Sequence, residues 1–284
     1  MYFSLNTAIF LTVLAAAMWG SWMQITKYLN GYPIVGVIFW LYSFSFLFVW
    51  AITFGIAPNL LEQSIVRTTR ENYPIIIKLL VSGGMMSLGV FCNLVIIGTV
   101  GLVLSTTISG GVGILLGLAT SILEEGLPEG QKIIILLTLT TLIFIMAGFL
   151  GAFASKSRDE DLNQIQEKKK ITWKLIVIML ISALLTNGWS MGTATGTAAD
   201  FPPVLTCAYM ATGSFLSIAI VCSVVFTVKK QWKQILCIGT SKRPIILSFI
   251  SAVCHYGGNM ISIYSMPVIS ATISFLLGKS SSLW

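Results

Sequence analysis

The sequence predicts an all-α polytopic membrane protein in which five transmembrane helices are followed by an inverted copy of the same five. Three observations lead to this fold class. Of the 284 residues, 56% are hydrophobic and only 10% are charged, whereas soluble domains carry roughly 25% charged residues. Long apolar stretches recur along the chain, and short blocks of the first half reappear in the second half. We expect about nine of the ten helices to be present.

The expected helices are set by stretches of about 20 apolar residues, which suffice to cross ~30 Å of hydrocarbon. Prolines such as Pro33 and Pro203 directly precede apolar runs, where a missing N–H costs little. A last stretch opens at Val268 and meets the end of the chain at Trp284. The complete expected spans cover residues 5–25, 34–56, 75–97, 102–123, 133–154, 173–195, 204–228 and 245–266.

Several blocks recur in the same order and at nearly one offset along the chain. VLSTTIS at 103–109 returns as VISATIS at 268–274. Ser45-Phe46-Leu47 returns as Ser214-Phe215-Leu216, and Tyr32-Pro33 returns as Phe201-Pro202 at the same offset as that block. We interpret this agreement as a repeat rather than as chance matching in apolar sequence. Because a unit of five helices is odd, the second copy inserts upside down.

One long polar stretch, KSRDEDLNQIQEKKK at 156–170, divides the chain. Its mixed charge and lack of apolar periodicity are typical of a linker. We therefore expect a first five-helix repeat over residues 1–155, a linker over 156–171 and a second repeat over 172–284. Since the span at 102–123 runs on to Leu123, its counterpart should continue past Trp284. We expect the sequence to be truncated within this ninth helix, before a tenth.

The net charge of +7 comes from basic residues in short segments between apolar stretches, not along one amphipathic face. This pattern indicates membrane topology and no nucleic-acid partner. By the positive-inside rule the 156–171 linker is cytoplasmic and the N-terminus lies outside, in a plasma or inner membrane, although Arg67 and Arg70 count against this orientation. The basic residues on the predicted cytoplasmic side are Lys27, Lys156, Arg158, Lys168, Lys169, Lys170, Lys174, Lys229, Lys230, Lys233, Lys242 and Arg243.

Short motifs at both ends of the chain resemble a known transporter group. Ten helices in an inverted five-plus-five repeat resemble the drug/metabolite transporter superfamily. MWGSW at 18–22, followed by Lys27, resembles the opening helix of its sugar-permease branch, which includes rhamnose, glucose/ribose and ureide permeases. SFLLGKSSSLW at 274–284 is similar to the ninth helix of that branch. The resemblance implies transport of a sugar or similarly small polar solute through a cavity between the halves, often with protons.

Polar residues inside the spans are the candidate substrate-binding residues, because each is costly in lipid unless it is paired or faces water. Indole rings can stack on sugar rings and donate N–H groups to hydroxyls. Asn93 and Asn259 also correspond in the repeat when a slip of a single position is allowed. The candidates are Trp19, Ser21, Trp22, Asn93, Asn187, Trp189, Tyr256, Asn259 and Lys279.

Three alternatives to a substrate-binding role stay open for these residues. Trp22 can instead be an aromatic anchor at the membrane interface. The glycines at 188, 192 and 196, which surround Trp189, favour close helix packing. Lys279 can lie at a frayed helix end.

His255 is the only histidine and lies within the span at 245–266. Imidazole titrates near neutral pH, so His255 is the candidate for proton coupling, if protons are coupled at all. The alternative is a buried neutral histidine that is bonded across helices. No acidic residue occurs in any expected span, which argues against a carboxylate site or an acid/base pair in the membrane.

The sequence therefore favours a secondary transporter for a sugar or similarly small polar solute. The rival transport hypothesis is an exporter of metabolites or drugs, and the rival from another class is a non-transporting membrane receptor or scaffold. We expect no enzyme activity. The five cysteines show neither C-x-x-C spacing nor a secreted-scaffold pattern, so we also expect no metal or other cofactor.

Overall fold

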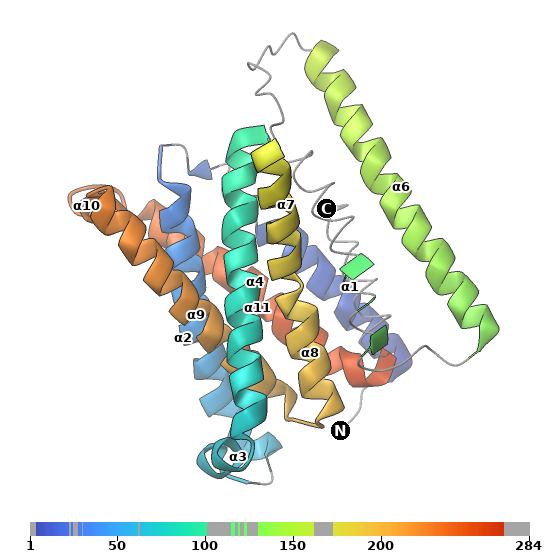
Figure 1. Cartoon of the computed structure of the whole chain (residues 1–284). Coiled ribbons are helices and arrows are strands. Elements are labelled where there is room, and N and C mark those ends of the chain that lie inside the picture. The colour runs from blue at the N-terminus through green and yellow to red at the C-terminus, as the bar shows by residue number, and fades with distance from the viewer. Residues whose placement is uncertain are drawn as a thin grey trace.

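The computed structural model describes residues 4–22, 24, 28–29, 31–61, 63–100, 115–116, 119, 122–123, 130–161 and 173–269. Every regular element in this part of the chain is helical (Figure 1). The helices are α1 (Leu5–Trp22), α2 (Ile34–Leu60), α3 (Ile65–Glu71), α4 (Tyr73–Val100), α6 (Gln131–Asp161), α7 (Trp173–Thr186), α8 (Gly188–Ala198), α9 (Pro203–Val228), α10 (Trp232–Ile235) and α11 (Arg243–Ile269).

Six helical segments among the described residues are long and apolar enough to cross a membrane. They correspond to the first, second, third, sixth, seventh and eighth expected spans, so the prediction of a polytopic α-helical membrane protein is confirmed at this level. The segments are Leu5–Trp22, Ile34–Gly55, Tyr73–Ile96, Val177–Ala198, Pro203–Val228 and Arg243–Met266.

Three expected spans, the fourth, the fifth and the ninth, are not among these six segments. The fifth corresponds to α6, but its described apolar stretch, Gln131–Ile143, is shorter than a full crossing. This helix also continues to Asp161, so the first six residues of the expected linker are helical. The fourth expected span, at 102–123, lies almost wholly outside the described residues, and so does the ninth beyond Ile269.

Two helix boundaries also differ from the sequence prediction. The sixth span is divided at Asn187 into α7 and α8. Pro267, expected to separate the eighth span from the ninth, lies within α11, which runs to Ile269. A proline late in a helix removes one backbone hydrogen bond but leaves the other turns bonded.

The helices pack in a definite order across the bundle. Helix α1 lies against α11, α11 against α2, α2 against α9, α9 against α4, and α4 against both α7 and α8. Helices that are distant in sequence are therefore neighbours, and α2 and α9 form the middle of the row. This order brings residues of both halves to the same interior.

Small residues let the α4–α9 pair approach most closely. A Cβ atom on Gly83 would overlap the carbonyl oxygen of Met210, and one on Gly213 would overlap that of Leu80. Close backbone approach of this kind is the usual use of glycine at helix contacts in membranes. We call this contact, made by Gly83, Gly84 and Gly213, the glycine seam.

Candidate functional site

Helices α1 and α11 are joined by a partly buried hydrogen bond. The Trp19 indole N–H donates to Oδ1 of Asn259, at 2.7 Å. The approach requires Gly258, because a Cβ there would lie 2.9 Å from Trp19 Nε1. An indole can only donate, so the amide oxygen must face Trp19. The Asn259 NH₂ group is therefore directed away from this bond.

His255 lies one turn before Asn259 and is enclosed by aromatic rings. Its ring centroid is 4.9 Å from that of Trp22, 5.8 Å from that of Tyr42 and 5.3 Å from that of Tyr256. The side chain is buried, and neither ring nitrogen has a hydrogen-bond partner among the described residues. The alternative of a histidine bonded across helices therefore finds no partner in the described part of the chain.

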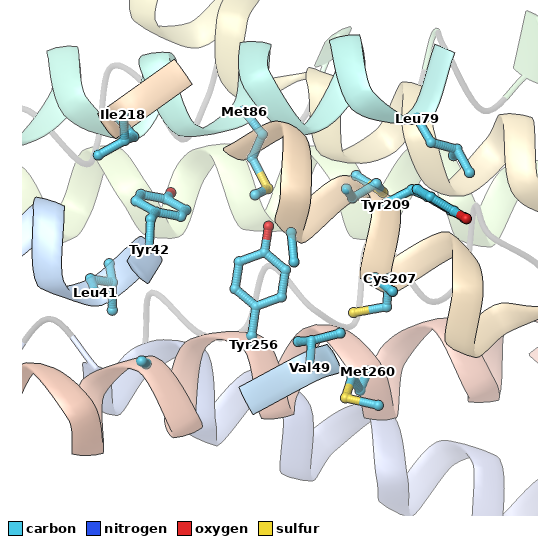
Figure 2. Packing of buried hydrophobic residues seen from close by; sticks show 14 of the residues in the cluster. Leu41, Tyr42, Val49, Leu79, Met86, Cys207, Tyr209, Ile218, Tyr256 and Met260 are labelled. Carbon is cyan, nitrogen blue, oxygen red and sulfur yellow. The ribbon is translucent and has the colours of Figure 1, made fainter. Parts of the chain in front are cut away.

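Tyr256 ties α11 to the glycine seam through a two-step hydrogen-bond relay. The Ser214 hydroxyl donates to the carbonyl of Gly83 at 2.8 Å. Its proton is thereby used, so the phenol of Tyr256 must donate to Ser214 Oγ, at 2.8 Å. Figure 2 shows the Tyr256 ring rising from α11 with its hydroxyl directed toward Met86 of α4. This phenol is thus satisfied within the protein.

These contacts define two groups, linked through the single turn of α11 between His255 and Asn259, that we together call the polar cluster. Every member touches another through a hydrogen bond or a ring contact, and the group draws on α1, α2, α9 and α11. It lies in the interior of the bundle. Its members are Trp19, Trp22, Tyr42, Ser214, His255, Tyr256 and Asn259.

Several buried polar groups at this cluster have no hydrogen-bond partner among the described residues. They are the Tyr42 hydroxyl, the Asn259 NH₂ group and both nitrogens of His255, with Ser45 Oγ one turn after Tyr42. Buried polar atoms are bonded in the great majority of proteins, and each unmet group costs about 1–3 kcal/mol. A concentration of such groups is expected where a polar ligand completes the hydrogen bonding.

Among the described residues, the surroundings of the cluster are aromatic and uncharged. Trp189 of α8 packs edge-on against Trp19, with ring centroids 6.0 Å apart. The only charged residues of the six membrane segments are Lys78, which is exposed near the start of α4, and Arg243, which begins α11. No group of three metal-ligating side chains occurs in the described part of the chain. The cluster is therefore suited to a neutral polar molecule with an apolar face.

Six predicted site residues converge in the structure. Trp19, Trp22, His255, Tyr256 and Asn259 belong to the polar cluster, and Trp189 borders it through Trp19. Trp22 is 4% exposed, so its indole does not face lipid as an interfacial anchor would. Its backbone carbonyl also accepts a hydrogen bond from Ser251 of α11.

The other predicted residues lie elsewhere. Ser21 is exposed and its hydroxyl donates to the carbonyl of Ala17 in the same helix. Asn187 stands at the junction of α7 and α8. Asn93 is buried on α4, one turn past Gly89, whose carbonyl accepts the hydroxyl of Ser182. Lys279 lies outside the described residues.

The glycines near Trp189 take part in close packing, as the sequence favoured. A Cβ on Gly188 would overlap the carbonyl of Ser82, and one on Gly192 would lie 2.6 Å from the Met210 side chain. These contacts hold α8 against α4 and α9. They fix the position of the intervening Trp189 without giving the glycines a ligand role.

Sequence reasoning missed Tyr42, Ser45 and Ser214. One signal was present for the serines, since they open the two copies of the repeated Ser-Phe-Leu block. Tyr42 carried no such mark, because a tyrosine in an aromatic-rich span is equally common in a core or at a lipid face. Its role emerges only from its contact with His255 and Tyr256.

The chain matches no protein-family model and no curated protein. The function therefore rests on the residues and the geometry described above.

Proposed function

We propose that the protein is a secondary transporter that carries a sugar or similarly small, neutral polar solute. The observation that carries this proposal is the concentration of buried, unpartnered polar groups at the polar cluster, inside a bundle of membrane-spanning segments. Hydroxyl, amide and imidazole groups can bond the hydroxyls of a solute, while Trp19 and Trp22 offer faces for its apolar side. The lack of ionised neighbours among the described residues favours a neutral solute over an ion.

The architecture that we propose is an inverted repeat of five plus five helices. In such a repeat the first, second and third spans are equivalent to the sixth, seventh and eighth. Replacing each helix of the packing row by its equivalent then gives the same row in reverse order, with the same helices in contact. The α1–α11 contact then corresponds to α4 with α7 and α8, and α2–α11 corresponds to α4–α9. A two-fold axis between α2 and α9 accounts for this order.

One pair of rings supports the position of this axis. Phe46 and Phe215 are equivalent residues in the repeated Ser-Phe-Leu block, and their rings stack with centroids 5.0 Å apart and planes inclined by 19°. A residue that contacts its own counterpart is characteristic of a two-fold axis passing between the two. Binding sites of inverted-repeat transporters lie at the interface of the repeats, where the polar cluster also draws on both halves.

Family, orientation and coupling are part of the same proposal. The resemblance to the sugar-permease branch of the drug/metabolite transporter superfamily supports a solute of this class. We place the N-terminus outside and the 156–171 linker in the cytoplasm. The basic loops after α1 and α9 are joined by a hydrogen bond from Gln234 to Gly31, as expected for loops on one side. His255 is the proposed coupling group.

The test is uptake of radiolabelled neutral hexoses and pentoses by proteoliposomes containing the purified protein, with and without an inward proton gradient. We expect saturable uptake of at least one neutral sugar and no uptake of a sugar phosphate. Asn259→Ala should lower uptake severalfold, because it removes an unpartnered donor from the cluster. Ser21→Ala, a matched change on the exposed face of α1, should leave uptake unchanged.

Other outcomes would select the alternatives. Transport of the solute only from the cytoplasmic side to the outside would favour an exporter. Saturable sugar binding without any movement across the bilayer would favour a receptor or scaffold. Neither binding nor transport of any neutral polar solute would contradict the proposal.

A further inference from the structure

At the end of the bundle that carries the basic loops, two aromatic side chains hold α10 in place. The Tyr32 hydroxyl and the Trp40 indole N–H both donate to the carbonyl of Ile235, at 2.8 Å and 3.0 Å. Ile235 is the last residue of α10, in the loop that joins α9 to α11. Burial raises the pKa of Tyr32, so its phenol stays a donor at neutral pH. We call this contact the Ile235 latch.

At the opposite end, a similar contact holds α3. The Thr69 hydroxyl donates to the carbonyl of Ile65 in the same helix. Since this uses its proton, the hydroxyl of Tyr209 donates to Thr69 Oγ1. The Tyr209 ring packs edge-on against Trp50, with centroids 5.6 Å apart. We call this contact the Thr69 latch.

The two latches occupy equivalent positions in the proposed repeat. At the offset that relates Ser45 to Ser214, Trp40 corresponds to Tyr209. The same offset relates Ile235 to Val66, within α3. The Ile235 latch joins α2 to α10, the short helix that follows α9. The Thr69 latch joins α9 to α3, the short helix that follows α2. Figure 1 shows α10 and α3 at opposite ends of the bundle.

Next to the Ile235 latch, aromatic rings form a continuous layer. Trp40 stacks on Phe44 with centroids 5.5 Å apart, and Phe44 packs edge-on against Phe249 of α11 at 5.4 Å. Phe39 joins Trp40 to Phe226 of α9, at 5.3 Å and 5.5 Å. The layer links α11, α2 and α9 beside the latch, and Phe249 at its edge is 47% exposed.

We propose that the Ile235 latch and the Thr69 latch are the two gates of an alternating-access cycle, with both closed in this structure. Releasing the Ile235 latch lets α10 and the aromatic layer move aside and opens the polar cluster to the side of the basic loops. Releasing the Thr69 latch opens it to the other side. This inference rests on the proposed transport function, because it assigns the two routes to the same central site.

The strength of the latches suits this role. A single intramolecular hydrogen bond shifts an equilibrium by roughly twofold to twelvefold, given its usual net contribution. A gate held by one or two such bonds opens under thermal motion, whereas a backbone contact such as the glycine seam does not. Removing the donors should therefore raise the open population by about tenfold.

The test measures access to the cluster from each side of a sealed membrane. Ser45→Cys places a reporter thiol at the cluster, and an impermeant maleimide is added to right-side-out or to inverted membrane vesicles. Labelling at position 45 is quantified by peptide-resolved mass spectrometry, which separates it from the five native cysteines. We expect slow labelling from both sides when the latches are intact.

Each latch variant should open one side only. Tyr32→Phe with Trp40→Phe should raise labelling about tenfold from the side of the basic loops, and Tyr32→Phe alone should give a smaller rise on that side. Tyr209→Phe and Thr69→Val should each raise labelling from the opposite side. The controls are Tyr28→Phe, an exposed tyrosine of the same loop as Tyr32, and Thr68→Val, which loses only a bond within α3.

Unchanged labelling in the latch variants, or increases on the same side for both latches, would overturn the inference. Increases of equal size in the control variants would overturn it as well. The labelling does not depend on any substrate. One-sided opening without sugar uptake would therefore leave the gates in place and count against the transport function alone.

Discussion

Two helix crossings of this bundle hold equivalent places in the packing row but are built from opposite kinds of side chain. The α4–α9 crossing is the glycine seam, where the backbones touch at Gly83 and Gly213. In the α2–α11 crossing, the rings of Phe44 and Phe249 meet with their centroids 5.4 Å apart. Phe44 corresponds to Gly213 at the offset of the repeated Ser-Phe-Leu block. Phe249 corresponds to Gly83 at the offset of the paired asparagines of α4 and α11.

The difference shows how one packing relation can serve two purposes. Backbone contact makes the glycine seam a close joint, and the polar group that it accommodates is the short Ser214 hydroxyl on the carbonyl of Gly83. The aromatic crossing instead brings the rings of Tyr42, His255 and Tyr256 into mutual contact. The polar cluster is therefore centred on the aromatic crossing. The predictions below test this asymmetry.

The largest expected effect is on the glycine seam. Gly83→Leu places a side chain where the Met210 carbonyl lies, and a rigid backbone cannot move aside. We expect a loss of about 3 kcal/mol or more of stability, seen as loss of monodisperse protein on size-exclusion chromatography in detergent. Gly55→Leu is the control, because no atom lies within 4 Å of a Cβ built there. Similar behaviour of the two variants would show that the seam is not tightly packed.

The second prediction concerns activity at the aromatic crossing. His255→Gln keeps hydrogen-bonding groups of similar reach but cannot titrate near neutral pH. We expect gradient-driven accumulation in proteoliposomes to be abolished, while solute exchange and binding stay largely intact. Undiminished accumulation would exclude His255 as the coupling group. Equal loss of binding would reassign it to the solute.

The third prediction tests the link between the two crossings. Tyr256→Phe removes the donor to Ser214, whereas Ser214 keeps its bond to Gly83. We expect a destabilisation of about 1 kcal/mol, measured as a lower midpoint of thermal unfolding in detergent. Tyr264→Phe, a half-buried tyrosine of the same helix, should have a smaller effect. If Tyr256→Phe causes no further destabilisation when Ser214 is already alanine, the hydrogen bond between the two residues accounts for the effect.

The smallest expected effect is the Trp19–Asn259 hydrogen bond. Interhelical bonds in membranes contribute on average about 0.6 kcal/mol, so a double-mutant cycle of Trp19→Phe and Asn259→Ala should give a coupling energy of this size. The cycle is measured by unfolding in mixed micelles. A coupling energy near zero would mean that the Trp19–Asn259 bond adds nothing to the α1–α11 contact, which the Ser251–Trp22 bond and the packing at Gly258 would then maintain.

Much of the fold follows from apolar length. Apolar stretches long enough to cross a bilayer, bounded by Pro33, Pro203 and Pro244, predicted segments that the structure contains within a few residues. The break at Asn187 was not predicted, because α7 and α8 read as one apolar stretch. A single-residue junction changes neither hydropathy nor composition.

The candidate site was predicted less completely. His255, Asn259 and the two tryptophans of α1 were recognisable, because polar and indole groups in an apolar span are conspicuous. Ser21 met the same criterion, yet it faces outward. Its hydroxyl is satisfied by a carbonyl of its own helix and needs no partner inside the bundle. Rotational position on a helix that is apolar all round cannot be derived from periodicity.

The sequence by itself determined that the chain carries several segments long and apolar enough to cross a membrane and that its two halves share short blocks, because these are properties of composition and order. The tertiary structure decided which helices meet, and hence that Tyr42 of α2 joins His255 and Tyr256 of α11. In lipid every face of a span can be apolar, so hydropathy does not select a partner. Partner choice depends on local shape, as where Gly258 admits Trp19 and Gly83 admits Met210.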